Sequence, residues 1–520
     1  MKRILIYIIS GVSLLLSSCG REFLTVRPIE DLTGNNYWQT KNDVDMFVQG
    51  LYSNFRNATM NHAFFTSTGD FRCAPIVRTP GSNGAGSFMN HLTFLKYNDL
   101  NGLFAQYYST TRLYSGGGVP AENSDYFGFK NIRNWGRFYL LIQKANIAIY
   151  EIGRLESGVI SDTEKKRYIA EAAFLRDLSY FFLVRLFGDV PYYTSAYFTD
   201  AVGRTPMLDV LEKTYQDMLS YYKDLPWSYT DQTLVGNKAM RGSALALMMH
   251  INMWLAGFSD LDKSQYYRRV DVLGKELVEE NEGAYDLLPL ENTKQIFKGR
   301  TKEGLFEIVQ NYNYGELFHL SAPYADYVLR APYKTHSITK SYIHYEPDFM
   351  KEMYPEEASD ARKTFWFEDI YATNGDFVCL KYTNVFADEN NEDFNPDDNQ
   401  IVFRYADAIL LRAEALAELS DEDGAKDMLN MVRDRANATL ITGESGQDLK
   451  DAIWWERVRE LLGEGHFFYD LVRTKKVLNS DYTSVPMSVS AFNQRAWTWP
   501  IDASAYINNP YMTPNRYWNF

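Results

Sequence analysis

Cysteine is scarce in this chain, and long hydrophobic runs are missing from it. Cys19, Cys73 and Cys379 are the only cysteines in 520 residues, which excludes a disulfide-stapled scaffold. A single bridge between Cys73 and Cys379 is left open. The one extended apolar run, residues 4–16, spans 13 residues, whereas a membrane-spanning helix needs about 20. The sequence therefore predicts no membrane-spanning helix.

Positive charge is also in short supply. The chain carries 53 Lys and Arg against 67 Asp and Glu, for a formal net charge of -14, and the basic residues form no sustained block. Proteins that bind nucleic acid present a basic patch to the phosphate backbone. We therefore expect no nucleic-acid partner.

Catalytic and metal-binding motifs are missing as well. The sequence contains no H-E-x-x-H, no Gly-x-Ser-x-Gly and no G-x-x-x-x-G-K-[ST], and its seven histidines lack metal-ligand spacing. The acidic stretch 387–398 offers oxygen ligands for Ca²⁺, but it lacks the glycine of an EF-hand loop, and a solvated surface loop is the alternative. We predict a non-enzymatic protein without a cofactor, and leave Ca²⁺ at 387–398 open.

The N-terminus is predicted to be an export signal with a lipid anchor. Lys2 and Arg3 precede the apolar run, and two serines follow it, so residues 1–18 have the pattern of a signal peptide. The string L-S-S-C that ends at Cys19 resembles the lipobox of Gram-negative lipoproteins, whose cysteine is acylated. Several acyl chains on Cys19 would hold the protein firmly on a bilayer. The alternative is an ordinary signal peptide followed by an unrelated cysteine.

Apolar periodicity predicts a long helix over residues 161–187. Ser161 and Glu164 form a capping-box pattern at its start, and Gly188 marks its end. Steps of four and three residues place one set of side chains on a single helix face: Tyr168, Ala172, Leu175, Ser179, Phe182 and Leu186.

Alanine-rich periodicity predicts paired helices in the C-terminal half. Two helices follow residue 403, and a break is expected at Asp423 and Gly424. Small residues let neighbouring helices approach closely, as in tetratricopeptide repeats, whose units need neighbours to bury their faces. We therefore predict a mainly α fold, with one tetratricopeptide-like scaffold formed by helices near 40–60, 137–260 and 403–475.

The stretches 62–130 and 285–400 lack clean periodicity. They are rich in Gly, Asn and Tyr and contain short strand-like runs such as GLFEIVQNY. Irregular insertions of this length are usually functional loops or disorder, and the aromatic content argues against disorder. We predict a loop-rich, mixed irregular subdomain that packs over one side of the helices and holds the ligand.

Aromatic residues make up 15% of the chain, and most of them must lie in the core. A few in the loop-rich stretches are candidates for stacking on sugar rings, beside polar groups that bond hydroxyls. For each candidate, ordinary packing or loop stabilisation is the alternative. By loop position these ligand-binding candidates are Asp70, Phe71, Arg72, Tyr97, Tyr312 and Tyr314.

The charged string WERVRELLGEG is predicted to be structural. A helix that alternates acids and bases usually satisfies them through ion pairs, so these residues are not read as a catalytic acid/base pair. The residues concerned are Glu456, Arg457, Arg459, Glu460 and Glu464, and the same prediction applies to Arg176, Arg412 and Glu414.

Several segments together resemble the SusD/RagB family of lipid-anchored outer-membrane nutrient-binding proteins. The similar segments are EFLTVRPIEDLTGNNYWQTKNDVDMFVQGLYSNF, AEAAFLRDLSYFFLVRLFGDVP, FRYADAILLRAEALAE, NMVRDRANA, WERVRELLGEGHFFYDLVRT and WTWPIDASAYINNPYMTPNRYW. They occur in the family's order along the whole chain. One departure is Phe467 after E-G-H, where the family often has Arg.

The resemblance implies a single domain over residues 19–520. It also implies a place on the exterior side of the outer membrane, where family members form a lid on a SusC-type TonB-dependent transporter. Oligosaccharides would be the captured ligand, with peptides in the same role as the first alternative. Two further alternatives stay open: a surface glycoside hydrolase, because two suitably spaced carboxylates suffice for that chemistry, and a purely structural surface lipoprotein.

Overall fold

The structure is a computed structural model that describes residues 37–59, 64–82, 90–109, 129–311, 324–387, 390, 394–507 and 509–518. Helices dominate it, which confirms the mainly α prediction. The predicted signal peptide, Cys19, Tyr312 and Tyr314 lie outside the described residues. None of the described helices is long and apolar enough to cross a membrane.

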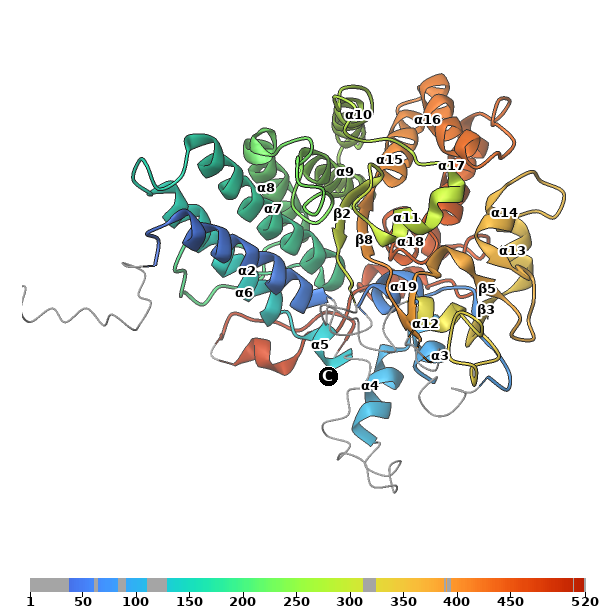
Figure 1. Cartoon of the computed structure of the whole chain (residues 1–520). Helices are drawn as coiled ribbons and strands as arrows, with labels where there is room; N and C mark the ends of the chain where they lie inside the picture. Colours follow the sequence, from blue (N-terminus) through green and yellow to red (C-terminus); the bar gives the residue numbers. More distant parts are fainter. Residues whose placement is uncertain are drawn as a thin grey trace, which may run out of the picture.

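The helical scaffold is a row of helices (Figure 1) in which neighbouring elements pack against each other, except that the last, Phe467–Arg473, packs against the fifth, Arg241–Phe258. In chain order the row comprises α2 (Lys41–Thr59), α6 (Gly136–Gly153), α7 (Asp162–Phe187), α8 (Met207–Tyr221), α9 (Arg241–Phe258), α10 (Ser264–Glu279), α15 (Tyr405–Glu418), α16 (Glu422–Arg435), α17 (Gly446–Glu460) and α18 (Phe467–Arg473). The contact between α10 and α15 joins the N-terminal and C-terminal blocks. The two blocks that periodicity singled out therefore form one continuous stack.

Helix α7 lies at the centre of the N-terminal block, between α6 and α8. Its capping box is formed as predicted, with the Ser161 hydroxyl accepting from the Glu164 backbone N–H, and Gly188 ends it with a φ of 73°. The predicted single buried face is too narrow, because every residue from Ala170 to Phe187 is buried. Neighbours on several sides require a helix that is apolar nearly all round.

The break between α15 and α16 lies earlier than predicted. Helix α15 ends at Glu418 and α16 begins at Glu422, so Gly424 is inside the first turn of α16 rather than in the break. Asp421 caps α16 by accepting a hydrogen bond from the Gly424 backbone N–H at 3.1 Å. The glycine was misread as a terminator because glycine more often follows a helix than begins one.

The loop-rich part contains short helices and four two-stranded antiparallel ribbons among the described residues. Its helices are α3 (Asn90–Lys96), α4 (Leu100–Ser109), α5 (Phe129–Arg133), α11 (Thr293–Lys298), α12 (Tyr324–Val328), α13 (Pro347–Met353), α14 (Arg362–Phe365) and α19 (Val489–Asn493). The ribbons pair β1 (Ile76–Arg78) with β3 (Ile343–Tyr345), β2 (Gly304–Ile308) with β8 (Gln400–Arg404), β4 (Phe367–Glu368) with β5 (Val378–Cys379), and β6 (Val385–Ala387) with β7 (Phe394–Pro396).

The β2–β8 ribbon links the loop-rich part to the scaffold. Strand β2 is buried along its whole length, and β8 runs directly into α15 at Arg404 and Tyr405. One hydrophobic core extends from Trp38 to Trp518 through both parts. Cys73 and Cys379 are buried free thiols, so the bridge that the sequence left open is not formed.

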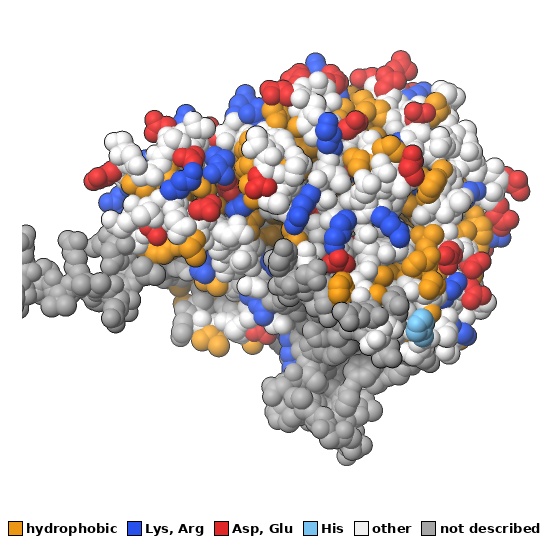
Figure 2. All heavy atoms as spheres, viewed as in Figure 1, with side chains coloured by type: hydrophobic (Ala, Val, Ile, Leu, Met, Phe, Trp, Pro, Cys, Tyr) orange, Lys and Arg blue, Asp and Glu red, His pale blue; other side chains and the backbone are white. Residues whose placement is uncertain are grey.

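Charges of both signs are interspersed over the face shown in Figure 2, without a large field of one sign.

The capping box on α7 provides a test of the local fold. Replacing Ser161 by Ala removes the acceptor for the Glu164 N–H, and we expect the free energy of unfolding to fall by about 1 kcal/mol. Urea unfolding followed by circular dichroism measures this change. The matched control is Ser480→Ala at an exposed position, and equal effects of the two substitutions would contradict the role of the cap.

Candidate functional site

The predicted ligand residues Asp70 and Arg72 lie inside the protein, where they bind other parts of the chain. Both carboxylate oxygens of Asp70 accept from the Gly465 backbone N–H, at 3.1 Å each. Burial raises the pKa of Asp70 well above its usual value. Arg72 donates to the carbonyl oxygens of Ala496 and Trp497, at 3.0 and 2.6 Å. These contacts tie the segment to the C-terminal region.

Phe71 is fully buried between Tyr324 and Tyr327, with ring centroids 5.9 and 5.0 Å away. Its ring is therefore part of the core. Together with Asp70 and Arg72 it follows the packing alternative that the sequence left open, and none of the three side chains faces solvent. Tyr97 is different, since its side chain is 59% exposed at the end of α3.

The charged string of α17 forms buried ion pairs, as predicted. Glu456 meets Arg362 at 2.6 Å and Glu460 meets Arg404 at 2.7 Å, and both carboxylates are inaccessible to solvent. Glu464, in the turn after the helix, meets Arg404 at 2.8 Å. The other residues in the prediction are also paired: Arg457 with Asp470, Arg459 with Glu456, Arg176 with Asp217, Arg412 with Glu279, and Glu414 with Arg473.

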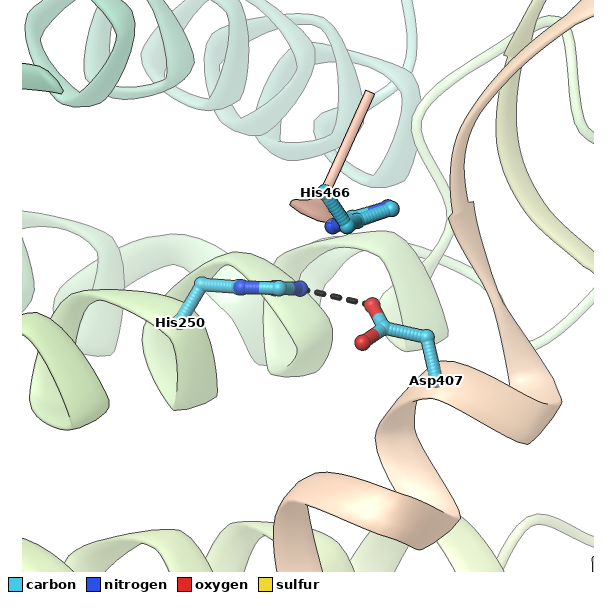
Figure 3. A group of neighbouring side chains, drawn as sticks. All are labelled: His250, Asp407 and His466. Atoms are coloured by element: carbon cyan, nitrogen blue, oxygen red, sulfur yellow. Dashed lines mark hydrogen bonds and ion pairs between the residues drawn. The ribbon is translucent and has the colours of Figure 1, made fainter. Parts of the chain in front are cut away.

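Two histidines that the sequence showed as scattered come together in the core with Asp407 (Figure 3). His250 on α9 points at Asp407 on α15, with 2.6 Å between Nε2 and Oδ2. The ring of His466 stacks on that of His250 with centroids 5.5 Å apart. No local spacing signals this cluster, because its members are far apart along the chain.

The carboxylate of this cluster is already engaged by other residues of the chain. Arg457 lies 2.9 Å from the other oxygen of Asp407, so both carboxylate oxygens already have partners. Burial on its own raises the pKa of Asp407, but His250 and Arg457 outweigh it and hold that pKa well below its usual value. Burial lowers the pKa of His250, and lowers that of His466 to about 4. Through these contacts Asp407 ties α15 to His250 of α9 and to Arg457 of α17 inside the core.

The acidic stretch 387–398, where Ca²⁺ was left open, is only partly described. Asp397 pairs with Lys298. Asp398 accepts from the Asn384 side chain at 2.7 Å, and burial raises its pKa well above the usual value. Both described carboxylates of this stretch are thus engaged by neighbouring side chains, and Ca²⁺ at 387–398 stays a prediction.

A cleft of about 500 Å³ opens where two loops of the scaffold meet a loop of the loop-rich part. This volume lies within the range of about 300–1,000 Å³ typical of small-molecule sites. Its lining includes Trp227, Ser228, Gln232, Glu282, Arg300 and Lys302. Trp227, Ser228 and Gln232 lie in the loop after α8, Glu282 lies in the loop after α10, and Arg300 and Lys302 lie in the loop after α11.

The aromatic wall of this cleft is held in place from behind. Tyr285 meets the Trp227 ring edge-on at 6.2 Å, and its hydroxyl donates to the Trp227 carbonyl oxygen at 3.0 Å. The Arg241 guanidinium lies 4.8 Å from the ring centroid. A fixed, half-buried indole beside amide, hydroxyl and charged groups suits a ligand with both an apolar face and hydroxyls.

Sequence reasoning missed Trp227 because it lies within residues 137–260, which were assigned to the helical scaffold. The string PWSYTDQT, between two predicted helices, was the available signal. It combines aromatic and polar residues in a loop, which is the pattern that marked the ligand-binding candidates in the loop-rich stretches.

A helical-repeat scaffold with loop-lined clefts is the architecture of a binding protein. Comparison with known proteins defines it further. Residues 324–518 match the model of the SusD family, and residues 82–251 match a model described as starch-binding and associating with the outer membrane. A SusD homologue of solved structure from Bacteroides thetaiotaomicron is 40% identical, with 93% of this chain and 100% of that chain covered and a TM-score of 0.83.

This chain belongs to the SusD family, which confirms the resemblance found in the sequence. NanU of Bacteroides fragilis shares the fold at 20% identity, with 95% of this chain and 100% of that chain covered and a TM-score of 0.70. SusD-like protein P38 of Formosa agariphila is 25% identical over 96% of both chains. The likeness therefore extends over nearly the whole chain.

The histidine cluster makes stability depend on pH. The pKa of His466 falls from about 6.5 in an unfolded chain to about 4 in the folded protein. Between these values the unfolded state binds a proton that the folded state does not, so the free energy of unfolding falls as pH falls, by up to about 1.4 kcal/mol per pH unit. His466→Gln should flatten this dependence in urea unfolding between pH 7 and 4.5. His336→Gln, at an exposed histidine, should leave it unchanged; an unaltered slope in His466→Gln would contradict the assignment.

Proposed function

We propose that this protein is a lipid-anchored outer-membrane binding protein that captures oligosaccharides for import through a SusC-type TonB-dependent transporter. Membership of the SusD family supports this role. The charged, apolar and small residues that lead to Cys19 support attachment through a lipid. The protein that carries these features would sit on the membrane surface and hand its ligand to the transporter.

The Trp227 cleft is the observation that favours an oligosaccharide. Its indole wall matches the apolar face of a sugar ring, and Ser228, Gln232 and Arg300 at the same cleft match the hydroxyls. Peptides are commonly captured by adding a strand to a sheet edge. The residues that line this cleft belong to loops and not to a strand, so the cleft favours a sugar over an extended peptide.

The cleft also favours binding over hydrolysis. Glycoside hydrolases use two carboxyl groups about 5–10 Å apart across the scissile bond. Among the residues that line the cleft, Glu282 is the only carboxylic acid. A sugar held there would meet one carboxylate and not the pair that hydrolysis needs.

Calorimetric titration of the soluble chain from Gly20 onward with a panel of oligosaccharides and peptides tests the proposal. We expect an oligosaccharide to bind without new products in the mixture, and Trp227→Ala to weaken binding at least tenfold, because an aromatic wall is lost. New products would make the protein a hydrolase, and peptide binding alone would change the ligand class.

Tyr97→Ala is the comparison variant, since Tyr97 is the exposed residue that the sequence proposed. A loss of affinity in Tyr97→Ala with none in Trp227→Ala would move the sugar site to the loop-rich face. Equal affinity in all three proteins would contradict both positions.

The anchor is tested separately. Cys19→Ser removes the thiol that would be acylated, and we expect the protein to lose incorporation of radiolabelled palmitate and to leave the membrane fraction. Cys73→Ser, at a buried thiol, should retain both properties. Palmitate incorporation in Cys19→Ser would contradict the assignment of the anchor.

A further inference from the structure

A second cleft, of about 270 Å³, lies where the end of α9 meets α10, α15, α17 and the turn after α18. It shares no lining residue with the Trp227 cleft. Basic residues dominate its lining: Lys263, Lys450, Arg473, Lys475 and Lys476. A basic cleft is unexpected in a chain with a net charge of -14.

The acids of this cleft are already neutralised. Arg473 holds both carboxylate oxygens of Glu414, at 2.6 and 2.8 Å. Lys450 pairs with Glu418 at 2.9 Å. These two ion pairs use both carboxylates that line the cleft. Of the remaining cations, Lys476 pairs with Asp451 outside the cleft at 2.5 Å.

Two of those cations have no ion pair within the described structure. Lys263 and Lys475 are both exposed and lie on the rim of the same cleft. Lys475 has a φ of 61° in the turn directly after α18, and its side chain lines the cleft.

The walls of the cleft are rigid and partly aromatic. Tyr267 contributes a half-buried ring. Trp454 is 2% exposed, and its indole N–H has no hydrogen-bond partner among the described residues. At the base, α9 and α18 touch so closely that a Cβ on Gly257 would lie 2.3 Å from the Arg473 carbonyl oxygen. The shape of the cleft is therefore set before any ligand binds.

We propose that this cleft binds a small molecule with an oxyanion group, a carboxylate, sulfate or phosphate, through Lys263 and Lys475. Ammonium groups bind such oxyanions by charge-assisted hydrogen bonds, and Tyr267 provides an apolar wall for the body of the molecule. The volume is slightly below the usual range for drug-sized ligands, which fits one sugar-sized unit. This site is independent of the proposed sugar capture at Trp227, so either proposal stands without the other.

Calorimetry of the soluble chain from Gly20 onward at constant ionic strength tests the site with four probes: inorganic sulfate, inorganic phosphate, glucuronate and uncharged glucose. We expect at least one anion to bind and glucose not to bind here. The double variant Lys263→Gln/Lys475→Gln should weaken anion binding at least tenfold. Binding of glucuronate alone would identify an acidic sugar, and binding of sulfate or phosphate alone would identify those oxyanions as the recognised group.

A matched control has the same change in net charge. Lys275→Gln/Lys294→Gln removes two exposed lysines elsewhere, and it should bind the anions as the unaltered protein does. Equal weakening in both double variants, or no anion binding at all, would overturn the proposal. The indole N–H signal of Trp454, assigned by its loss in Trp454→Phe, should shift on anion addition in the nuclear magnetic resonance spectrum; an unmoved signal would place the anion elsewhere.

Discussion

The buried acids of α17 are the constraint on which the rest of the structure depends. Glu456 and Glu460 project from successive turns of the helix, and Glu464 follows in the next turn. Their partners are cations from other regions: Arg362 of α14, Lys381 after β5 and Arg404 at the end of β8. A buried charge that loses its partner costs about 3–5 kcal/mol. The loop-rich part and the scaffold are therefore held in one register, because a shift of either would leave several charges unpaired.

The network continues through the other side of the same helix. Arg457 meets Asp407 at 2.9 Å and Asp470 at 3.0 Å. Asp470 also binds Arg473, which holds Glu414 at the wall of the basic cleft. A chain of ion pairs thus runs from the histidine cluster in the core to a surface cleft. It explains why Arg473 is unavailable to a ligand there, while the lysines of the rim are available.

Sequence patterns within one helix predicted the features that depend on contacts within that helix. The capping box of Ser161 and Glu164 follows from spacing along one helix. The alternating charges of α17 predicted that ion pairs form, but their partners, such as Arg362, come from other elements. The contacts of Asp70 and Arg72 do not follow from local spacing, because their partners, Gly465 and the carbonyl group of Trp497, lie 395 and 425 residues further along the chain. A polar and aromatic string in a glycine-rich loop has the same composition whether it binds a ligand or closes a core. A ligand-binding loop and a loop that packs into the core differ in their distant partners, and the local sequence does not reveal those partners.

The fold of this chain is shared by solved structures of low sequence identity. Solved relatives that are 16–40% identical to this chain superpose with TM-scores of 0.63–0.83 over more than nine-tenths of its length. The residues of the ion-pair network are buried and mutually dependent, so they resist replacement one at a time. Trp227 and the lysines of the second cleft project from loops and rims, where substitution costs little stability. The ligand of this protein therefore has to be inferred from the side chains of each cleft and not from the fold.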